Sequence, residues 1–242
     1  MVEIIPAILP VDLEDLRDKM ARVSGLASLV QIDICDGKFV PSHTWPYVKD
    51  GMGEFEQIIS EEEGFPFWDS LDFEIDLMIK NPEEVVNDWV KAGAKRLVFH
   101  IESTHNILET IENLRTEYGT ARDEIFGLQL GLSLDIETPN EELFEILDLI
   151  DEDGNSIVDF VQFMGIKNVG FQHQDFAEEV LEKISDLRGM YPNMPISVDG
   201  GVNFDNAAEL ISAGATRLVS GSAIFESDDI AKAINDLANS GE

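Results

Sequence analysis

The chain has 242 residues, 44% of them hydrophobic, which is enough apolar material for one sizeable core. Its 49 acidic and 16 basic residues give a formal net charge of −33, which disfavours binding to nucleic acid and to anionic membranes. No apolar run approaches the roughly 20 residues that cross a bilayer, and the N-terminus lacks the pattern of a signal peptide.

Cys35 is the only cysteine, so no disulfide forms within the chain, and a reducing cytoplasm is the expected location. A small buried hydrophobe is favoured over a reactive thiol at this position. The acidic residues are spread over many predicted helices. This favours a solvated, highly soluble acidic surface, as in proteins adapted to high salt, over an acidic partner-binding face.

Strand and helix patterns alternate along the chain. Short apolar runs predict eight strands, at Glu3–Leu9, Leu29–Ile34, Leu71–Met78, Arg96–His100, Gly127–Ser133, Ile157–Phe163, Ile196–Val198 and Arg217–Ser220. Amphipathic stretches between them predict helices at Leu13–Val23, Glu54–Glu62, Pro82–Ala92, Asn106–Tyr118, Glu141–Leu149, Phe176–Met190, Asn206–Ala213 and Asp229–Leu237. Eight such units, with no linker between them, favour one α/β domain over residues 1–242, a single (β/α)8 TIM barrel, over an open doubly wound sheet.

Polar residues gather where these strands end, and in a parallel barrel the carboxyl ends of the strands form the working face. The residues expected around this mouth are Asp33, Asp36, Asp76, His100, Met164, Asp199 and Ser222. Asp33 or Asp199 alone is equally well explained as a loop cap. Two carboxylates on the strand ends of one barrel favour a polar binding site.

Two glycine-rich turns follow the last two predicted strands. Gly200 and Gly201 come directly after Asp199, and Gly221 and Ser222 follow the eighth strand. Barrels often bind phosphate with these two loops, because backbone N–H groups reach the anion where no side chain intervenes. Either turn alone is explained by tight strand-to-helix geometry, but the two together predict a phosphate site.

Five segments, in matching order and spacing, resemble motifs of the ribulose-phosphate 3-epimerase family: Ile5–Leu9, Asp33–Pro41, Glu74–Met78, Val198–Gly201 and Gly221–Phe225. The chain is similar to this family along nearly its whole length. The resemblance implies an isomerase that epimerises C3 of a ketopentose phosphate, of the ribulose 5-phosphate/xylulose 5-phosphate type, through an enediolate. It also implies a small phosphorylated sugar as ligand, and a homo-oligomer is compatible with it.

The same resemblance implies a divalent metal, which the family holds with two histidines and two aspartates. Asp33 and Asp199 match the two aspartates, which the family also uses as its catalytic acid and base. Gln31 and Asp76 stand at the two histidine positions. Three carboxylates and one amide oxygen suit Mg²⁺ or Mn²⁺ better than Zn²⁺. Asp76 is equally well explained as a polar cap of its strand.

Other family positions concern the substrate. Met78 and Met164 match methionines that pack against the sugar phosphate. In the loop after the sixth strand Gly170 is retained, whereas Gln172 and His173 replace a glycine pair. His100 ends the fourth strand, where it either orients a carboxylate of the mouth or is a satisfied polar group of the core.

The chemistry leads to the same pair of carboxylates. Inversion at a carbon beside a ketone needs a base on one face and an acid on the other, and Asp33 and Asp199 lie on strands well apart around the mouth. The alternative is a non-catalytic or altered-specificity phosphosugar-binding barrel that has lost the histidine ligands. A related sugar-phosphate decarboxylase is disfavoured, because Cys35 and Lys38 stand at the Lys and second Asp of its Asp-x-Lys-x-x-Asp motif.

Overall fold

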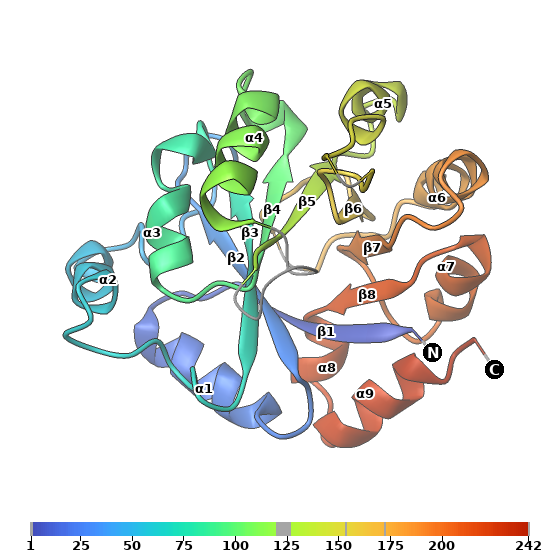
Figure 1. Cartoon of the computed structure of the whole chain (residues 1–242). Coiled ribbons are helices and arrows are strands. Elements are labelled where there is room, and N and C mark those ends of the chain that lie inside the picture. The colour runs from blue at the N-terminus through green and yellow to red at the C-terminus, as the bar shows by residue number, and fades with distance from the viewer. Residues whose placement is uncertain (1, 120–126, 153, 172, 242) are drawn as a thin grey trace.

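Eight parallel strands close into a barrel in the computed structural model, which describes residues 2–119, 127–152, 154–171 and 173–241 (Figure 1). The strands are β1 (Glu3–Ile8), β2 (Leu29–Cys35), β3 (Asp72–Met78), β4 (Arg96–His100), β5 (Gln129–Leu134), β6 (Phe160–Met164), β7 (Ile196–Asp199) and β8 (Arg217–Ser220). Each strand pairs in parallel with the next, and β8 closes the ring on β1. The predicted (β/α)8 barrel is confirmed.

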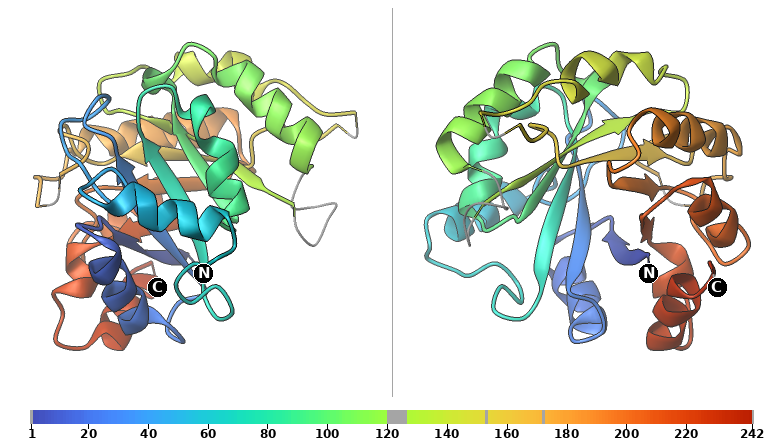
Figure 2. Two further views of the ribbon diagram at one scale, coloured as in Figure 1. Left: turned by 90° about the vertical axis from the view of Figure 1, so that its left-hand side faces the viewer. Right: turned by 45° about the vertical axis from the view of Figure 1, so that its right-hand side comes forward.

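Helices surround the strands on the outside (Figure 2). They are α1 (Leu13–Val23), α2 (Gly51–Ile59), α3 (Val86–Lys91), α4 (Ile107–Tyr118), α5 (Glu141–Leu147), α6 (Glu179–Met190), α7 (Ala207–Ala213), α8 (Ser222–Phe225) and α9 (Ile230–Ala238). Two short 3₁₀ turns, η1 (Pro82–Glu84) and η2 (Ile101–Ser103), precede α3 and α4. Among the described residues, no helix has both the length and the apolar character that a bilayer crossing requires.

Helix α1 shows how sequence pattern and burial agree. Leu13, Leu16, Met20 and Val23 are spaced three or four residues apart and are all buried, so they form one apolar stripe against the barrel. The side chain of Asp12 caps the helix by accepting a hydrogen bond of 2.8 Å from the backbone N–H of Asp15.

The structure corrects some predicted boundaries. The helix predicted at Pro82–Ala92 is a 3₁₀ turn followed by α3, because the backbone of Val85, with φ −127°, leaves the helical region between them. Strand β2 continues to Cys35, so Asp33 lies two residues before the strand end rather than at it. Helix α8, which follows Gly221 directly, was not predicted.

Charged side chains fill the opposite end of the barrel from the mouth. Glu74 is fully buried there, and its carboxylate lies 3.4 Å from the Arg96 guanidinium. Arg96 and Arg217 also contact Glu3, at 3.0 and 3.1 Å. Burial raises the pKa of Glu74 to about 7 despite the two arginines. This charged cluster of Glu3, Glu74, Arg96 and Arg217 closes the floor of the barrel.

Candidate functional site

Strands β2 and β3 bring the candidate ligands to one face. Residues two apart on a strand point to the same side, so Gln31 and Asp33 point the same way from β2. Asp76 is the register partner of Asp33 on β3. Asp199 ends β7 and is only 7% exposed. The barrel closure thus places side chains from distant parts of the sequence around a common centre.

Gln31 links the two predicted catalytic carboxylates. Its amide nitrogen Nε2 donates hydrogen bonds of 2.8 Å to Asp33 Oδ1 and 2.8 Å to Asp199 Oδ2. Its oxygen Oε1 is buried and has no hydrogen-bond partner among the described residues. Gln31 therefore offers an oxygen to a metal only if its amide turns over, and its role as a ligand stays a prediction.

The three aspartates form a group that fits a divalent cation. One oxygen from each of Asp33, Asp76 and Asp199 lies within 4.8 Å of the others. Asp76 is fully buried and accepts hydrogen bonds from His100 Nε2 at 3.0 Å and from Gln162 Nε2 at 3.3 Å. Three crowded carboxylates, of which Asp76 and Asp199 are buried and Asp33 is half-buried, favour a bound cation, because a cation relieves their mutual repulsion.

Burial shifts the titration of these groups. Loss of water, and then repulsion from Asp199 and Asp76, raises the pKa of Asp33 well above its usual range. Burial and repulsion from Asp76 raise the pKa of Asp199 to about 7. For His100, burial favours the neutral ring, but Asp76 and Asp135 outweigh it and raise the pKa to about 10. His100 thus contacts a carboxylate beneath the mouth, which agrees with the first of the two interpretations of this residue and not with the second, a satisfied polar group of the core, which the sequence slightly favoured.

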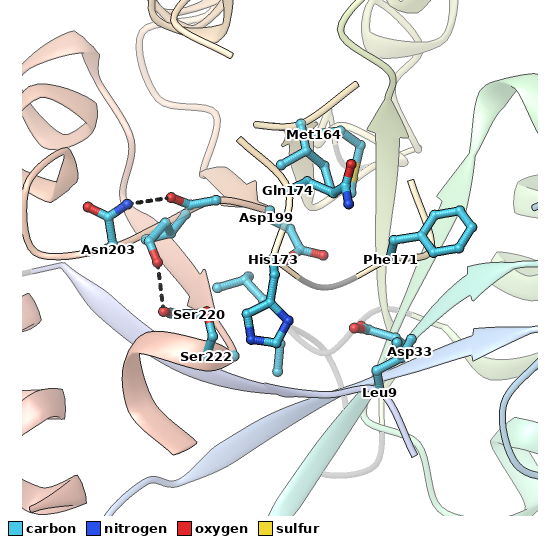
Figure 3. Close-up of a pocket in the computed structure, with 18 of the residues that line it drawn as sticks. Leu9, Asp33, Met164, Phe171, His173, Gln174, Asp199, Asn203, Ser220 and Ser222 are labelled. Atoms are coloured by element: carbon cyan, nitrogen blue, oxygen red, sulfur yellow. Dashed lines mark hydrogen bonds between the residues drawn. The ribbon is translucent and has the colours of Figure 1, made fainter. Parts of the chain in front are cut away.

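A pocket opens above Asp33 and Asp199, whose carboxylates point into the space between them (Figure 3). All the residues predicted to contact the substrate or its phosphate line this pocket: Met78, Met164, Gly170, Gly200, Gly201, Gly221 and Ser222. Gln31 and Asp76 lie outside its lining, behind the two aspartates that they contact or face. The structure therefore brings the predicted residues together in two layers, a carboxylate centre and a glycine-rich rim.

Gly200 shows why the rim needs glycine. Its φ of +93° belongs to a region that side chains disfavour, and a Cβ atom there would lie 2.7 Å from Ile166 Cγ1. The turn is fixed by Asn203, whose Nδ2 donates to the carbonyl of Gly201 at 3.0 Å. Backbone at this turn thus borders the pocket closely, as a phosphate site requires.

Several lining residues were not predicted. Asn203 and Ser220 hold the glycine turn, and Ser220 Oγ donates to the carbonyl of Val202 at 3.0 Å. His173, by contrast, was expected on the phosphate side; it lines the pocket, and its Nε2 lies 2.6 Å from Glu226 Oε1. Gln172 lies outside the described residues. Gln162 contacts Asp76 and does not line the pocket. It was also missed, although a glutamine inside the apolar run of β6 is a recognisable signal of a buried polar contact.

Comparisons with known proteins agree with these features. A sequence profile described as "Ribulose-phosphate 3 epimerase family" matches residues 3–225. The chain is 34% identical over 241 residues to a chloroplastic ribulose-5-phosphate-3-epimerase of Arabidopsis thaliana, covering 96% of this chain and 74% of that protein. It is 30% identical over 247 residues to the ribulose-phosphate 3-epimerase of Bacillus subtilis (strain 168), covering 99% and 100%.

A solved structure of KGPDC from Streptococcus mutans aligns with a TM-score of 0.67. The alignment covers 99% of this chain and 96% of that one at 14% sequence identity. At this identity the likeness shows the barrel fold alone.

Proposed function

The chain belongs to the ribulose-phosphate 3-epimerase family, and from this premise we propose that it epimerises C3 of a ketopentose phosphate of the ribulose 5-phosphate/xylulose 5-phosphate type. The observation that carries the proposal is the pair Asp33 and Asp199, facing each other below a glycine-rich rim. A cytoplasmic location is part of the same proposal and is in keeping with the buried thiol of Cys35.

Asp33 and Asp199 are the proposed base and acid. One carboxylate removes the proton from C3, beside the C2 ketone, and leaves an enediolate. The other, in its protonated form, returns a proton to the opposite face of C3 and so inverts the centre. In the cation-free protein their surroundings raise the pKa of both groups, which favours a carboxylic acid beside a carboxylate, the two forms that the step requires.

The rim is the proposed phosphate site. Backbone N–H groups of Gly200, Gly201, Gly221 and Ser222 would bind the anion, while Met78 and Met164 would pack against the sugar. Backbone donors matter in this chain because its net charge of −33 repels an anionic substrate at long range. Gly170 would close the third side of the pocket.

Asp33, Asp76 and Asp199 would hold a divalent cation, with Gln31 Oε1 as a fourth oxygen if its amide turns. An all-oxygen set favours Mg²⁺ or Mn²⁺ over Zn²⁺. When bound, the cation polarises the ketone and stabilises the negative charge of the enediolate. His100 and Gln162 would hold the Asp76 carboxylate in place through their hydrogen bonds.

One observation favours a second candidate, a phosphosugar-binding barrel without epimerase activity. The Gln31 amide already satisfies Asp33 and Asp199 with hydrogen bonds, so these two carboxylates have a partner without a cation. In that case the pocket would bind the sugar phosphate and leave C3 unchanged.

Turnover of ribulose 5-phosphate separates the two candidates. The purified protein would be stripped of metal with a chelator and assayed after addition of Mn²⁺, Mg²⁺, Fe²⁺ or Zn²⁺. We expect xylulose 5-phosphate to form, fastest with Mn²⁺ or Mg²⁺. Calorimetric binding of the sugar phosphate without turnover under any of these conditions would establish the binding-only function instead.

A further inference from the structure

A second group of ligand-type side chains lies beside the carboxylate centre, at the ends of β4 and β5. His100 ends β4, Glu102 lies in η2, and Asp135 follows β5. One atom from each of these residues lies within 4.8 Å of the others. We propose that His100, Glu102 and Asp135 bind a divalent transition-metal ion, at a site separate from the group of Asp33, Asp76 and Asp199.

The strongest observation is a set of buried polar atoms that lack hydrogen bonds. His100 Nδ1, Glu102 Oε2 and Asp135 Oδ1 are each buried, and none has a hydrogen-bond partner among the described residues. His100 is fully buried, so water does not satisfy its Nδ1 from bulk solvent. Polar atoms left in this state are costly, and a shared cation would satisfy all three at once.

The orientation of the His100 ring suits metal binding through Nδ1. Its other nitrogen, Nε2, lies 3.0 Å from Asp76 Oδ1. In the neutral ring, a carboxylate that accepts the Nε2 proton leaves the lone pair on Nδ1, which is the usual arrangement behind a metal-binding histidine, so the ion would displace the Nδ1 proton that the charged ring carries. Asp76 thus acts as the outer partner of this site. The ring of Phe39, 5.3 Å away between centroids, covers the imidazole.

The spacing also suits an ion. His100 Nδ1 and Asp135 Oδ1 are 3.7 Å apart, too far for a hydrogen bond. Two ligands that each lie about 2.1 Å from one metal are themselves roughly 3 to 3.5 Å apart, so a small closure accommodates the ion. Glu102 is already held, because its Oε1 accepts a 2.9 Å hydrogen bond from the backbone N–H of Asp135.

The net charge of the groups around the site favours a bound cation. Lys183 is a neighbouring positive group, but its ammonium donates to backbone carbonyls, among them those of Asp135 at 2.8 Å and Ile136 at 3.3 Å. Once an ion has displaced the Nδ1 proton of His100, the carboxylates of Glu102 and Asp135 outnumber the Lys183 ammonium and leave a negative balance. The Asp135 side chain is 32% exposed, which gives an ion a path from solvent.

The donor set selects the ion. One imidazole nitrogen with two carboxylate oxygens suits Mn²⁺, Fe²⁺, Co²⁺ or Zn²⁺, whereas Mg²⁺ prefers oxygen alone. Mg²⁺ is therefore expected only at the group of Asp33, Asp76 and Asp199.

The alternative to a bound ion at His100 and Asp135 is a proton on His100 Nδ1, which pairs with the Asp135 carboxylate.

Calorimetric titration of the chelator-treated protein with Mn²⁺ alone tests the site. We expect two equivalents in the unmodified protein. Glu102→Gln and Asp135→Asn should each weaken one of them by roughly tenfold or more, while Asp33→Asn should spare that same one. Glu137→Gln, which removes an exposed charge from the same loop, is the matched control and should bind as the unmodified protein does.

A second readout places the ion at His100. In the Asp33→Asn variant, Mn²⁺ should broaden the ring ¹⁵N signals of His100, and Glu102→Gln added to this variant should abolish that effect at the same Mn²⁺ concentration. The proposal is overturned if both equivalents persist in Glu102→Gln and Asp135→Asn. It is also overturned if the His100 ring keeps its Nδ1 proton and is unaffected by Mn²⁺. This proposal does not rest on the proposed function, because the epimerase assay can succeed or fail whether or not His100, Glu102 and Asp135 bind Mn²⁺.

Discussion

At the residue scale, Asp199 combines a proposed chemical role with a cost in stability. Its pKa is raised to about 7 by burial and by Asp76, whereas the same carboxyl in the unfolded chain titrates near 4. Between these values the folded state binds more protons than the unfolded state, so stability falls as pH rises. Glu74, raised to about 7, acts in the same direction. The pKa of His100 is raised to about 10, so its contribution to the free energy of unfolding is lost as pH rises from about 6.5.

We therefore predict that the chelator-treated protein is more stable toward urea at pH 5 than at pH 8. Asp199→Asn removes one of these titrations and should reduce that difference by on the order of 1–3 kcal/mol. Unfolding curves of both proteins at the two pH values measure it. Equal pH dependence in the two proteins, or greater stability at pH 8, would refute the assignment.

Gly200 carries a prediction about the rim. Gly200→Ala forces a Cβ atom into a positive-φ position 2.7 Å from Ile166, so we expect a loss of roughly 1–3 kcal/mol in stability and weaker binding of inorganic phosphate. Gly189→Ala is the control, because a Cβ there meets nothing within 4 Å and helix α6 gains by up to about 1 kcal/mol. If Gly200→Ala matches the control in both stability and phosphate binding, the rim does not depend on this backbone geometry.

The residues of the site differ in how far the sequence alone predicts them. Asp33, Asp199 and the rim glycines stand in recognisable strand-end motifs, and the structure places all of them at one pocket. The contact of Asp76 with Gln162 could not be predicted, because it joins β3 to β6 across the closed barrel. Such contacts depend on strand register, which hydrophobic pattern fixes only after the barrel closes.

At the scale of elements, the strands were predicted better than the ends of the helices. Arg96–His100 and Arg217–Ser220 have the predicted bounds, because a short apolar run between turns leaves little freedom. The helix at Pro82–Ala92 was predicted as continuous, but its break at Val85 leaves no mark in the apolar pattern. Cap geometry decides helix ends, and it depends on packing as well as on sequence.

The barrel floor gives the element-scale prediction. Arg96→Met removes the guanidinium 3.4 Å from the buried Glu74 carboxylate and its contact with Glu3. Removing one partner of a buried ion pair is expected to cost about 3–5 kcal/mol. Arg17→Met, which breaks the exposed pair with Glu63, should cost less than about 1 kcal/mol. Urea unfolding at pH 8 compares them, and similar losses would show that the floor cluster contributes no more than a surface pair.

At the scale of the whole molecule, eight strands in one closed ring support the proposal that residues 1–242 form a single domain. The net charge of −33 acts on this whole unit, since self-repulsion favours expanded states. Salt screens such repulsion, with a Debye length of about 10 Å at 0.1 M and about 3 Å at 1 M.

We predict that raising KCl from 0.1 to 1 M increases Tm by several degrees, in one cooperative transition seen alike by tryptophan fluorescence and circular dichroism. A fall in Tm with KCl would show that repulsion does not limit stability. Two separate transitions would contradict the single domain.

The most direct test of the central claim, that Asp33 and Asp199 invert C3, is deuterium incorporation at C3 from D₂O. The unmodified protein, supplied with Mn²⁺, should turn over and exchange C3 starting from either epimer. Asp33→Asn and Asp199→Asn should each lower turnover by roughly 10²–10⁴ and abolish exchange from the epimer whose C3 proton faces the changed residue. Full turnover, or unimpaired exchange from both epimers, in either variant would contradict the account.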